Sequence, residues 1–331
     1  MKFKWMGLVS IPAIAAGVIP AMTLTSCKDD NEEEDNREKV IIDTDVGNDC
    51  DDIGALSVLG NVYKQNKINI LAVTVCNQYL PAYHTTDIML EEYGIDCPMG
   101  MSDNNQKVHT DWGNDYANAV DLGWEARSRK DWSRIQSATR VLRKTLANNK
   151  KGKIKLITLG MLNNIANLLD SGPDDISSKT GRELFEENIS EMILMGGRFD
   201  NEMETYQEFN IHEAPEAAKK VINTTSVPKT FCGWEVGNPV KTGQTFYDNP
   251  ETPQYVAYLT YNKGQLRESW DPLTMYVALT GDAQYSQKGT VTVEDSHTLF
   301  EPKETGNCRF VQIYQDVPAI QAKLESWYTI G

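Results

Sequence analysis

The chain has 331 residues, of which 32 are Lys or Arg and 47 are Asp or Glu, so its formal net charge at pH 7 is −15. Apolar residues make up 40 % and charged residues 24 %, proportions that exclude a disordered or collagen-like chain. The strong acidity argues against nucleic acid as a partner, because phosphate binding needs a basic face. Six cysteines are too few for a disulfide scaffold. The length fits one large α/β domain or two smaller ones.

The N-terminus has the pattern of a secretory signal. Two lysines in the first four residues precede an apolar run over 5–24, which leads into Leu-Thr-Ser-Cys with the cysteine at position 27. This ending resembles the lipobox of bacterial lipoproteins, which implies cleavage after residue 26 and lipidation of Cys27. The alternative is a signal anchor in which the cysteine has no such role.

A charged segment follows the cysteine. Residues 28–39 contain seven acidic residues, three basic residues and no apolar residue, which predicts a solvated tether. An acidic run in this position resembles the surface-export signals of some lipoproteins, and a plain spacer fits equally well. We therefore expect a cell-envelope lipoprotein held in the outer membrane by its N-terminal lipid, facing either the periplasm or the surface, with a folded domain over 40–331.

Strands and helices alternate along the predicted domain. In chain order, the patterns predict a strand at 40–42, a helix at 53–59, a strand at 68–75, a helix at 82–93, a strand at 154–159, a helix at 162–169, a strand at 192–195, helices at 215–222 and 271–279, strands at 290–293 and 310–313, and a helix near Ile320. This order predicts a single open, mostly parallel sheet flanked by helices. Ligands of such sheets bind at the carboxyl ends of the strands, so the chemistry is expected just after Ile42, Val75, Leu159 and Met195.

An acidic loop follows the first predicted strand. Residues 43–52 (Asp-Thr-Asp-Val-Gly-Asn-Asp-Cys-Asp-Asp) hold five carboxylates, which repel one another unless a cation compensates them. Clustered oxygen ligands suit a hard cation such as Ca²⁺ or Mg²⁺. Two alternatives remain: a solvated loop with Asx turns and a helix cap, and the Asp-x-Asp loop of a haloacid-dehalogenase-type phosphatase, which expects Thr or Val where this chain has Gly47.

The loop also resembles the opening signature of the inosine-uridine preferring nucleoside hydrolase family. Asp43-Thr44-Asp45-x-Gly47 and Asp51-Asp52-x-x-Ala55-Leu56 match it, with two more residues between the glycine and the aspartate pair than the family has. Further blocks agree in order: Val75-Cys76-Asn77, 158–166, Met195-Gly196-Gly197, Glu208-Phe209-Asn210, 215–218 and Trp270-Asp271-Pro272. The resemblance implies hydrolysis of the N-glycosidic bond of ribonucleosides, a reaction of purine and pyrimidine salvage.

The resemblance also implies a division of roles. A Ca²⁺ ion would be held by the side chains of Asp45, Asp52 and Asp271 and the backbone carbonyl of Leu159, with Asp45 also acting as the base that deprotonates water. The substrate would be bound by six residues: Asp51, Asn77, Met195, Glu208, Phe209 and Asn210.

Help for the leaving base is the least determined role. Many family members have a histidine where this chain has Trp270, and an indole cannot protonate a base, although it can stack on a purine and exclude water. His109 is the other candidate acid, with a surface loop histidine as the alternative. Stacking by Trp270, Trp112 and Trp234 would favour purines.

Other functions stay open at this stage. A surface lipoprotein could capture nucleosides or sugars with little turnover, or the hydrolase could act on another N-ribosyl compound. The sequence also leaves open whether the protein is a homo-oligomer.

Overall fold

The structure is a computed structural model that describes residues 35–104, 106–110, 115–124, 132–200 and 207–328. The predicted signal, Cys27 and Trp112 lie outside these ranges. The chain divides into two units, residues 1–36 and 37–331, and every strand and helix given below belongs to the second. In the described ranges, no helix is both long and apolar enough to cross a lipid bilayer.

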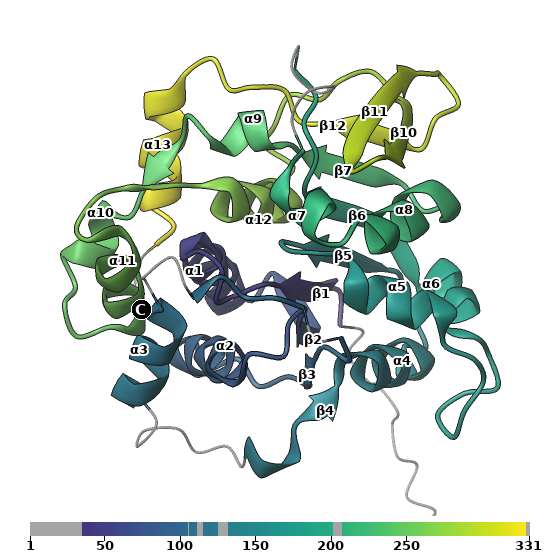
Figure 1. Ribbon diagram of the computed structural model, residues 1–331, viewed down its shortest axis with the longest axis horizontal. Helices are drawn as coiled ribbons and strands as arrows, with labels where there is room; N and C mark the ends of the chain where they lie inside the picture. The colour runs from purple at the N-terminus through teal and green to yellow at the C-terminus, as the bar shows by residue number, and fades with distance from the viewer. Residues whose placement is uncertain (1–34, 105, 111–114, 125–131, 201–206, 329–331) are drawn as a thin grey trace, which may run out of the picture. The chain divides into compact units, whose positions relative to one another are not determined.

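Ten strands of the described residues form one mixed, mostly parallel sheet (Figure 1). Its order is β11-β10-β12-β7-β6-β5-β1-β2-β3-β4, and only β10 runs antiparallel to its neighbours. The strands are β1 (Glu38–Thr44), β2 (Ile68–Val75), β3 (Met99–Met101), β4 (Gln136–Ser137), β5 (Ile154–Thr158), β6 (Ile189–Met195), β7 (Lys229–Cys232), β10 (Gly289–Glu294), β11 (His297–Pro302) and β12 (Cys308–Phe310). A separate two-stranded sheet pairs β8 (Lys241–Thr242) with β9 (Arg267–Glu268).

Helices cover both faces of the large sheet. They are α1 (Asp51–Lys64), α2 (Leu80–Glu92), α3 (Tyr116–Trp124), α4 (Ala138–Asn148), α5 (Asn163–Asp170), α6 (Gly181–Asn188), α7 (Phe209–Glu213), α8 (Pro215–Thr224), α9 (Trp234–Gly237), α10 (Gln244–Tyr247), α11 (Pro253–Asn262), α12 (Trp270–Thr280) and α13 (Val317–Glu325), with a short 3₁₀ turn at Trp132–Arg134.

The central strand β1 separates two hydrophobic cores. Successive side chains of a strand point to opposite faces, so Val40 and Ile42 pack with α1, α2, α3, α11 and α12, whereas Ile41 packs with α4, α5, α6 and α8. Figure 1 shows these two groups of helices on opposite sides of the sheet. Because β1 is buried on both faces, its sequence is a continuous apolar run rather than an alternating one.

The predicted fold class is confirmed, with one strand misplaced. The predicted strand at 310–313 is wrong in position: β12 covers Cys308–Phe310, and beyond it only Val311 forms an isolated bridge, to Tyr285. β12 pairs with β7 along Lys229 to Phe231, and Phe231 is the last residue in that register. The apolar residues after Phe310 therefore have little strand to pair with.

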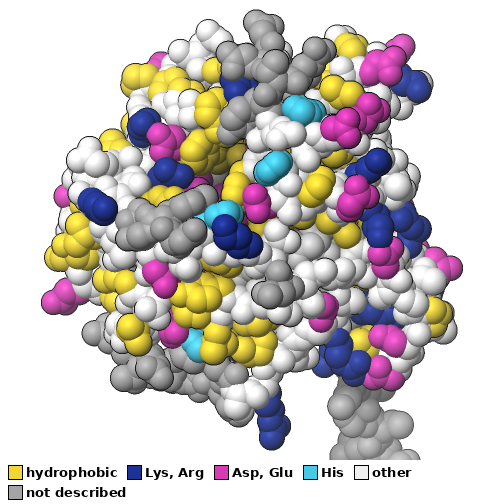
Figure 2. All heavy atoms as spheres, in the orientation of Figure 1, with side chains coloured by type: hydrophobic (Ala, Val, Ile, Leu, Met, Phe, Trp, Pro, Cys, Tyr) yellow, Lys and Arg dark blue, Asp and Glu magenta, His cyan; other side chains and the backbone are white. Residues whose placement is uncertain are grey.

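The carboxyl ends of three neighbouring strands meet in the middle of the sheet. β6, β5 and β1 are adjacent and parallel. Asp45 follows β1, Leu159 follows β5, and Met195 ends β6. On the face seen in Figure 2, acidic and basic side chains are interspersed. A cluster of carboxylates lies in a pocket at these three strand ends.

Candidate metal centre and binding pocket

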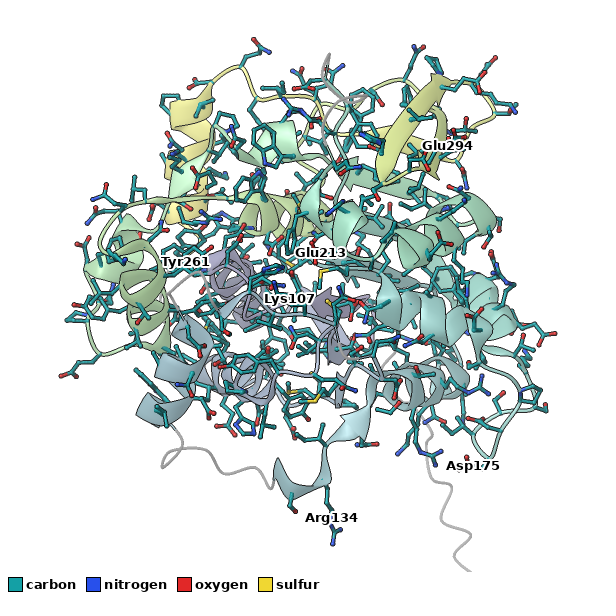
Figure 3. The ribbon with its side chains drawn as sticks, viewed as in Figure 1. Lys107, Arg134, Asp175, Glu213, Tyr261 and Glu294 are labelled. Atoms are coloured by element: carbon teal, nitrogen blue, oxygen red, sulfur yellow. The ribbon has the colours of Figure 1, made fainter. Side chains whose placement is uncertain are left out.

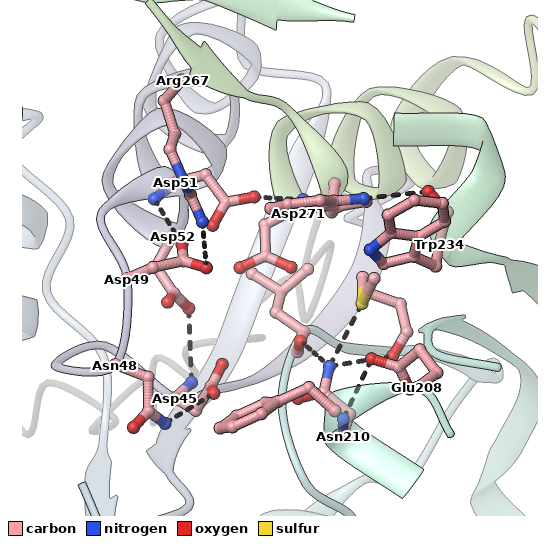
Figure 4. A pocket seen from close by; sticks show the side chains of 14 residues that line it. Asp45, Asn48, Asp49, Asp51, Asp52, Glu208, Asn210, Trp234, Arg267 and Asp271 are labelled. Atoms are coloured by element: carbon pink, nitrogen blue, oxygen red, sulfur yellow. Dashed lines mark hydrogen bonds and ion pairs between the residues drawn. The ribbon is translucent and has the colours of Figure 1, made fainter. Parts of the chain in front are cut away.

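A pocket of about 180 Å³ lies at these strand ends. It is lined by the loop after β1, the first turn of α1, the ends of β5 and β6, the start of α7, the start of α9, and the segment from β9 into α12. Figure 4 shows side chains from these elements pointing toward a common space. This is the place that the sheet topology predicted.

Three buried carboxylates converge in this pocket. Asp45 comes from the loop after β1, Asp52 from the first turn of α1 and Asp271 from the first turn of α12, and one oxygen of each lies within 4.8 Å of the others. Their exposed fractions are 5 %, 2 % and 4 %. α1 and α12 pack against each other, so residues more than 200 positions apart in the sequence form one cluster.

Hydrogen bonds fix the orientation of the cluster. The Asp45 backbone N–H donates to Asp52 Oδ1 at 3.3 Å, and the Thr44 hydroxyl donates to the same oxygen. The Asn48 side-chain amide donates to Asp45 Oδ2 at 2.9 Å. The Asp271 backbone N–H donates to Asp51 Oδ2 at 3.0 Å. The carboxylates of Asp45, Asp51 and Asp52 are therefore held in place before any cation binds.

The electrostatics of the cluster favour a cation. Burial raises the pKa of Asp52 to about 7. Burial and the neighbouring carboxylates raise the pKa values of Asp45 and Asp271 well above the ordinary range. Like charges at this distance destabilise one another, and a divalent ion removes that penalty. An all-oxygen donor set suits a hard cation such as Ca²⁺, so the residues present fit the predicted ion.

The loop after β5 lies against the loop after β1. Leu159 is buried at the pocket wall, and its carbonyl accepts a 2.7 Å hydrogen bond from the Asn210 amide, with a second lone pair left for a ligand. A Cβ added to Gly160 would lie 2.4 Å from the Asp45 Cβ. Glycine is therefore what permits the loop after β5 to pack directly against Asp45.

Glu208 and Asn210 form the opposite wall. The Glu208 carboxylate accepts from the backbone N–H groups of Gly197, Asn210 and Ile211 at 2.9–3.2 Å and so caps the start of α7. Burial raises its pKa to about 7 despite these bonds. Phe209 between them and Met195 at the end of β6 also line the pocket. These four are residues predicted to bind substrate.

Aromatic rings line another part of the pocket. Trp234 and Trp270 lie with ring centroids 6.4 Å apart at an interplanar angle of 30°, and Trp270 Nε1 donates to the Trp234 carbonyl at 2.9 Å. Because the rings are flat and apolar, they suit a planar heterocycle rather than a sugar. The pocket thus has an acidic part and an aromatic part.

Two of the predicted site residues do not line the pocket. The Asn77 amide donates to the Val46 carbonyl at 3.0 Å and accepts from the Tyr79 N–H, so it supports the acidic loop from behind. The His109 ring lies edge-on to Phe209, with centroids 5.5 Å apart, and its Nε2 is 3.6 Å from Glu213. Figure 3 shows Glu213 near the middle of the view.

Sequence reasoning missed the pairing of Asp49 with Arg267. Asp49 belongs to the lengthened part of the acidic loop, and its Oδ2 accepts from Arg267 Nη2 at 2.9 Å. Burial raises the pKa of Asp49, but the Arg267 guanidinium and the Asp51 N–H lower it by more than burial raises it. The net pKa of Asp49 is therefore below its ordinary value. Asp49 is thereby drawn toward Arg267 instead of joining the other carboxylates. The extra length of the loop indicated that this part of the site differs from the usual family pattern, but it did not indicate that Arg267 pairs with Asp49.

Comparisons with known proteins identify the family of this chain. The sequence model of the inosine-uridine preferring nucleoside hydrolase family matches residues 40–317. The chain belongs to this family. Membership of the nucleoside hydrolase family disfavours the phosphatase alternative, because the family match includes the Asp-x-Asp sequence at Asp43 and Asp45 on which that alternative rested.

Individual relatives are distant. An uncharacterized protein of Schizosaccharomyces pombe is 25 % identical over 284 residues, which cover 79 % of this chain and 86 % of that protein. Among solved structures, the inosine-uridine preferring nucleoside hydrolase of Bacillus anthracis is similar with a TM-score of 0.67 at 17 % identity, covering 88 % of this chain and 97 % of that one. A plant nucleoside hydrolase gives a TM-score of 0.66 at 20 % identity, with coverages of 88 % and 99 %. The TM-scores of these two solved structures show a shared fold.

Proposed function

We propose that this protein is a Ca²⁺-dependent N-ribohydrolase that cleaves ribonucleosides into ribose and free base. The observation that carries the proposal is the convergence of three buried carboxylates, Asp45, Asp52 and Asp271, within 4.8 Å at the bottom of a pocket that also has an aromatic wall. Family membership supports the reaction class. A site of this kind can bind a sugar diol and a planar base side by side.

Each residue then has a defined task in the hydrolysis. When bound by the three carboxylates and the Leu159 carbonyl, the ion supplies Lewis acidity toward the ribose diol and the attacking water. Asp45 takes the proton of that water, and its Oδ2 is already oriented by the Asn48 amide at 2.9 Å. The C1′–N bond breaks as the C1′–O bond forms, with positive charge building on the ribose.

The remaining pocket residues bind the sugar and the base. Asp51, Glu208 and Asn210 supply hydrogen-bonding groups for the hydroxyls, and their own bonds to backbone groups hold them in place. Stacking on the rings of Trp234 and Trp270 favours purines over pyrimidines. His109 as a leaving-group acid stays a prediction, because its ring contacts Phe209 of the pocket wall but does not itself line the pocket.

The test measures turnover and binding separately. Purified protein is incubated with inosine, adenosine and uridine, with and without a chelator, and ribose release is followed along with nucleoside binding by calorimetry. We expect chelator-sensitive ribose release that is lost in Asp45→Ala and retained in Asp121→Asn, a control whose carboxylate pairs with His84 outside the pocket. Binding without ribose release would identify a nucleoside-binding protein instead, and cleavage of p-nitrophenyl phosphate would restore the phosphatase alternative.

We also propose an envelope location, which rests on the sequence of the first 39 residues alone. Expressed with its own N-terminus in a Gram-negative host, the protein should incorporate radiolabelled palmitate and fractionate with the outer membrane. Cys27→Ala should abolish both. Palmitate incorporation that survives this substitution would disprove lipidation at Cys27, and protease treatment of intact cells would tell a surface position from a periplasmic one.

A further inference from the structure

Among the described residues that line the pocket, Arg267 is the one cationic side chain. Six carboxylates share the pocket with it: Asp45, Asp49, Asp51, Asp52, Glu208 and Asp271. Its side chain is 18 % exposed. It lies on β9, three residues before Trp270. A guanidinium at the wall of such an acidic pocket is positioned to meet negative charge on a bound molecule, because it is the side chain there that carries a positive charge.

Arg267 is held in place from several directions. Its Nη2 bonds Asp49 at 2.9 Å and its Nη1 bonds Glu268 at 3.2 Å. The guanidinium carbon lies 5.0 Å above the Trp270 ring and 5.1 Å above the Tyr261 ring of α11. Figure 4 shows the side chain extending from β9 toward Asp49, and Figure 3 places Tyr261 on the α11 side. The group is therefore fixed before a ligand arrives.

The lengthened acidic loop supplies the anchor. Asp49 binds Arg267 through Oδ2 and accepts the Asp51 N–H through Oδ1 at 3.1 Å, and Asp51 in turn accepts the Asp271 N–H. The arginine is thus linked by a short chain of hydrogen bonds to the carboxylate cluster. Its distance from the ribose site is fixed by the same loop that carries Asp45.

Donor capacity of the guanidinium is left over. An arginine has five N–H groups, and the two ion pairs account for two of them. Nε is buried and has no hydrogen-bond partner among the described residues. Because Nε is covered by protein, a ligand in the pocket would accept from the remaining N–H groups of Nη1 and Nη2, and these spare donors at the pocket wall point to a ligand. Arg267 and Trp270 line the same pocket, so a base bound beside this indole can also meet the guanidinium.

We propose that Arg267 binds the departing base and stabilises the negative charge that builds on it. This inference rests on the proposed hydrolase function. As the C1′–N bond breaks, its electron pair passes to the base nitrogen, the water oxygen bonds C1′ and the water proton passes to Asp45. Arg267 keeps its own proton, because a guanidinium stays charged in proteins, and donates hydrogen bonds to a carbonyl oxygen or ring nitrogen of the base. The base anion takes its proton from solvent afterwards.

Substrates with different leaving groups test this role. Inosine releases hypoxanthine as a poorly stabilised anion, whereas p-nitrophenyl β-D-riboside releases p-nitrophenolate, which needs little help. Arg267→Gln should lower kcat/KM for inosine by about 30-fold or more, the usual size of the loss of a hydrogen bond to a charged group. It should lower kcat/KM for the nitrophenyl riboside by less than about threefold. Arg267→Lys keeps the charge without the planar fork and should fall in between.

Arg309→Gln is the matched control. Arg309 also stacks on a tyrosine, 3.8 Å above the Tyr285 ring, and bonds the Thr230 hydroxyl at 2.9 Å, but it does not line the pocket. Both substrates should react with this variant as with the wild type. Circular dichroism checks folding, and if Arg267→Gln does not fold, Arg267→Lys carries the comparison. As a readout independent of turnover, calorimetry should show weaker binding of free hypoxanthine to the Arg267 variants.

The outcomes separate the two proposals. Equal losses on both substrates would overturn the leaving-group role and make Arg267 a structural residue. If the wild-type protein cleaves the nitrophenyl riboside but not inosine, the leaving-group role of Arg267 would also be overturned, although the proposal that the protein hydrolyses ribosides would stand. A wild-type protein that cleaves neither substrate in the presence of Ca²⁺ would instead refute the proposed function.

Discussion

Replacing Asp271 with asparagine should stabilise the calcium-free protein while weakening its response to calcium. Asp271 lies within 4.8 Å of both Asp45 and Asp52. Coulomb's law at an effective dielectric constant of about 20 gives about 3 kcal/mol of repulsion for each such pair of charges. Partial protonation limits the total, because burial and the neighbouring carboxylates hold the pKa of Asp271 well above its ordinary value. We therefore expect a net gain of about 3 kcal/mol at pH 8.

Thermal unfolding at pH 8, in chelator and in excess Ca²⁺, measures both effects. In chelator, Asp271→Asn should raise Tm by about 5 °C, since the Tm of a domain of this length shifts by about 1.6 °C per kcal/mol. In Ca²⁺, the wild type should gain stability by mass action, about 2.7 kcal/mol at 100 times Kd, and the variant should gain much less. Asp282→Asn, beyond the other end of α12, is the control: it loses a bond from the Tyr276 hydroxyl and should leave the calcium shift unchanged.

The decisive feature is that the substitution should raise Tm in chelator and reduce the increase in Tm caused by calcium. A variant that lowers Tm in chelator and retains the full calcium shift would show that the three carboxylates do not share an ion. Lower Tm in both conditions with a reduced shift would mean that Asp271 is needed for packing, and the repulsion argument would fail.

Three further predictions concern single contacts. Gly160→Ala should abolish the calcium-induced Tm shift, because the added Cβ would lie 2.4 Å from the Asp45 Cβ. Burial raises the pKa of Glu235 from 4.5 to about 7, so the folded protein binds the proton of this carboxyl more tightly than the unfolded chain does. The contribution of Glu235 to stability therefore falls as the pH rises between those two values. In urea unfolding, Glu235→Gln should raise the free energy of unfolding by about 3 kcal/mol at pH 8 and leave it unchanged below pH 4. Arg143 is 2 % exposed and binds Asp174 with two 2.8 Å bonds, so Arg143→Met should cost about 3 kcal/mol in the same assay.

The central strands of the fold were predictable because strands that are buried on both faces have continuous apolar runs in their sequence. β2 begins and ends at the predicted residues, and the neighbouring β1 and β5 differ from prediction only at their ends. β7 was missed because it begins with Lys229, a residue that seldom lies in a buried strand. Its ammonium group is satisfied by the carbonyls of Thr225 and Val227, a local solution that the pattern of residues does not reveal. β3 has three residues, too few for any periodicity to appear.

The candidate site was predictable to the extent that strand ends and resemblance define it. Asp45, Asp52 and Asp271 were expected to meet, and the structure brings them together. The partner of Asp49 could not be predicted, because Arg267 is 218 positions away on a two-residue strand. Asn77 follows its strand as expected, but a side chain in a loop can face either the pocket or the loop backbone. Here Asn77 bonds the Val46 carbonyl.

The burial of α1 and α12 explains how the fold tolerates the repulsion in its pocket. Most residues of both helices are buried, so they contact other elements on all sides rather than along one stripe. The carboxylates at their N-termini therefore cannot relieve their repulsion by moving apart, and proton uptake or cation binding remain as the ways to lower it. A site held this rigidly pays no further ordering cost when an ion binds. The same rigidity fixes Arg267 relative to Asp45 through Asp49, which is why the proposed base-binding group and the proposed water-activating group are expected to act at one fixed spacing.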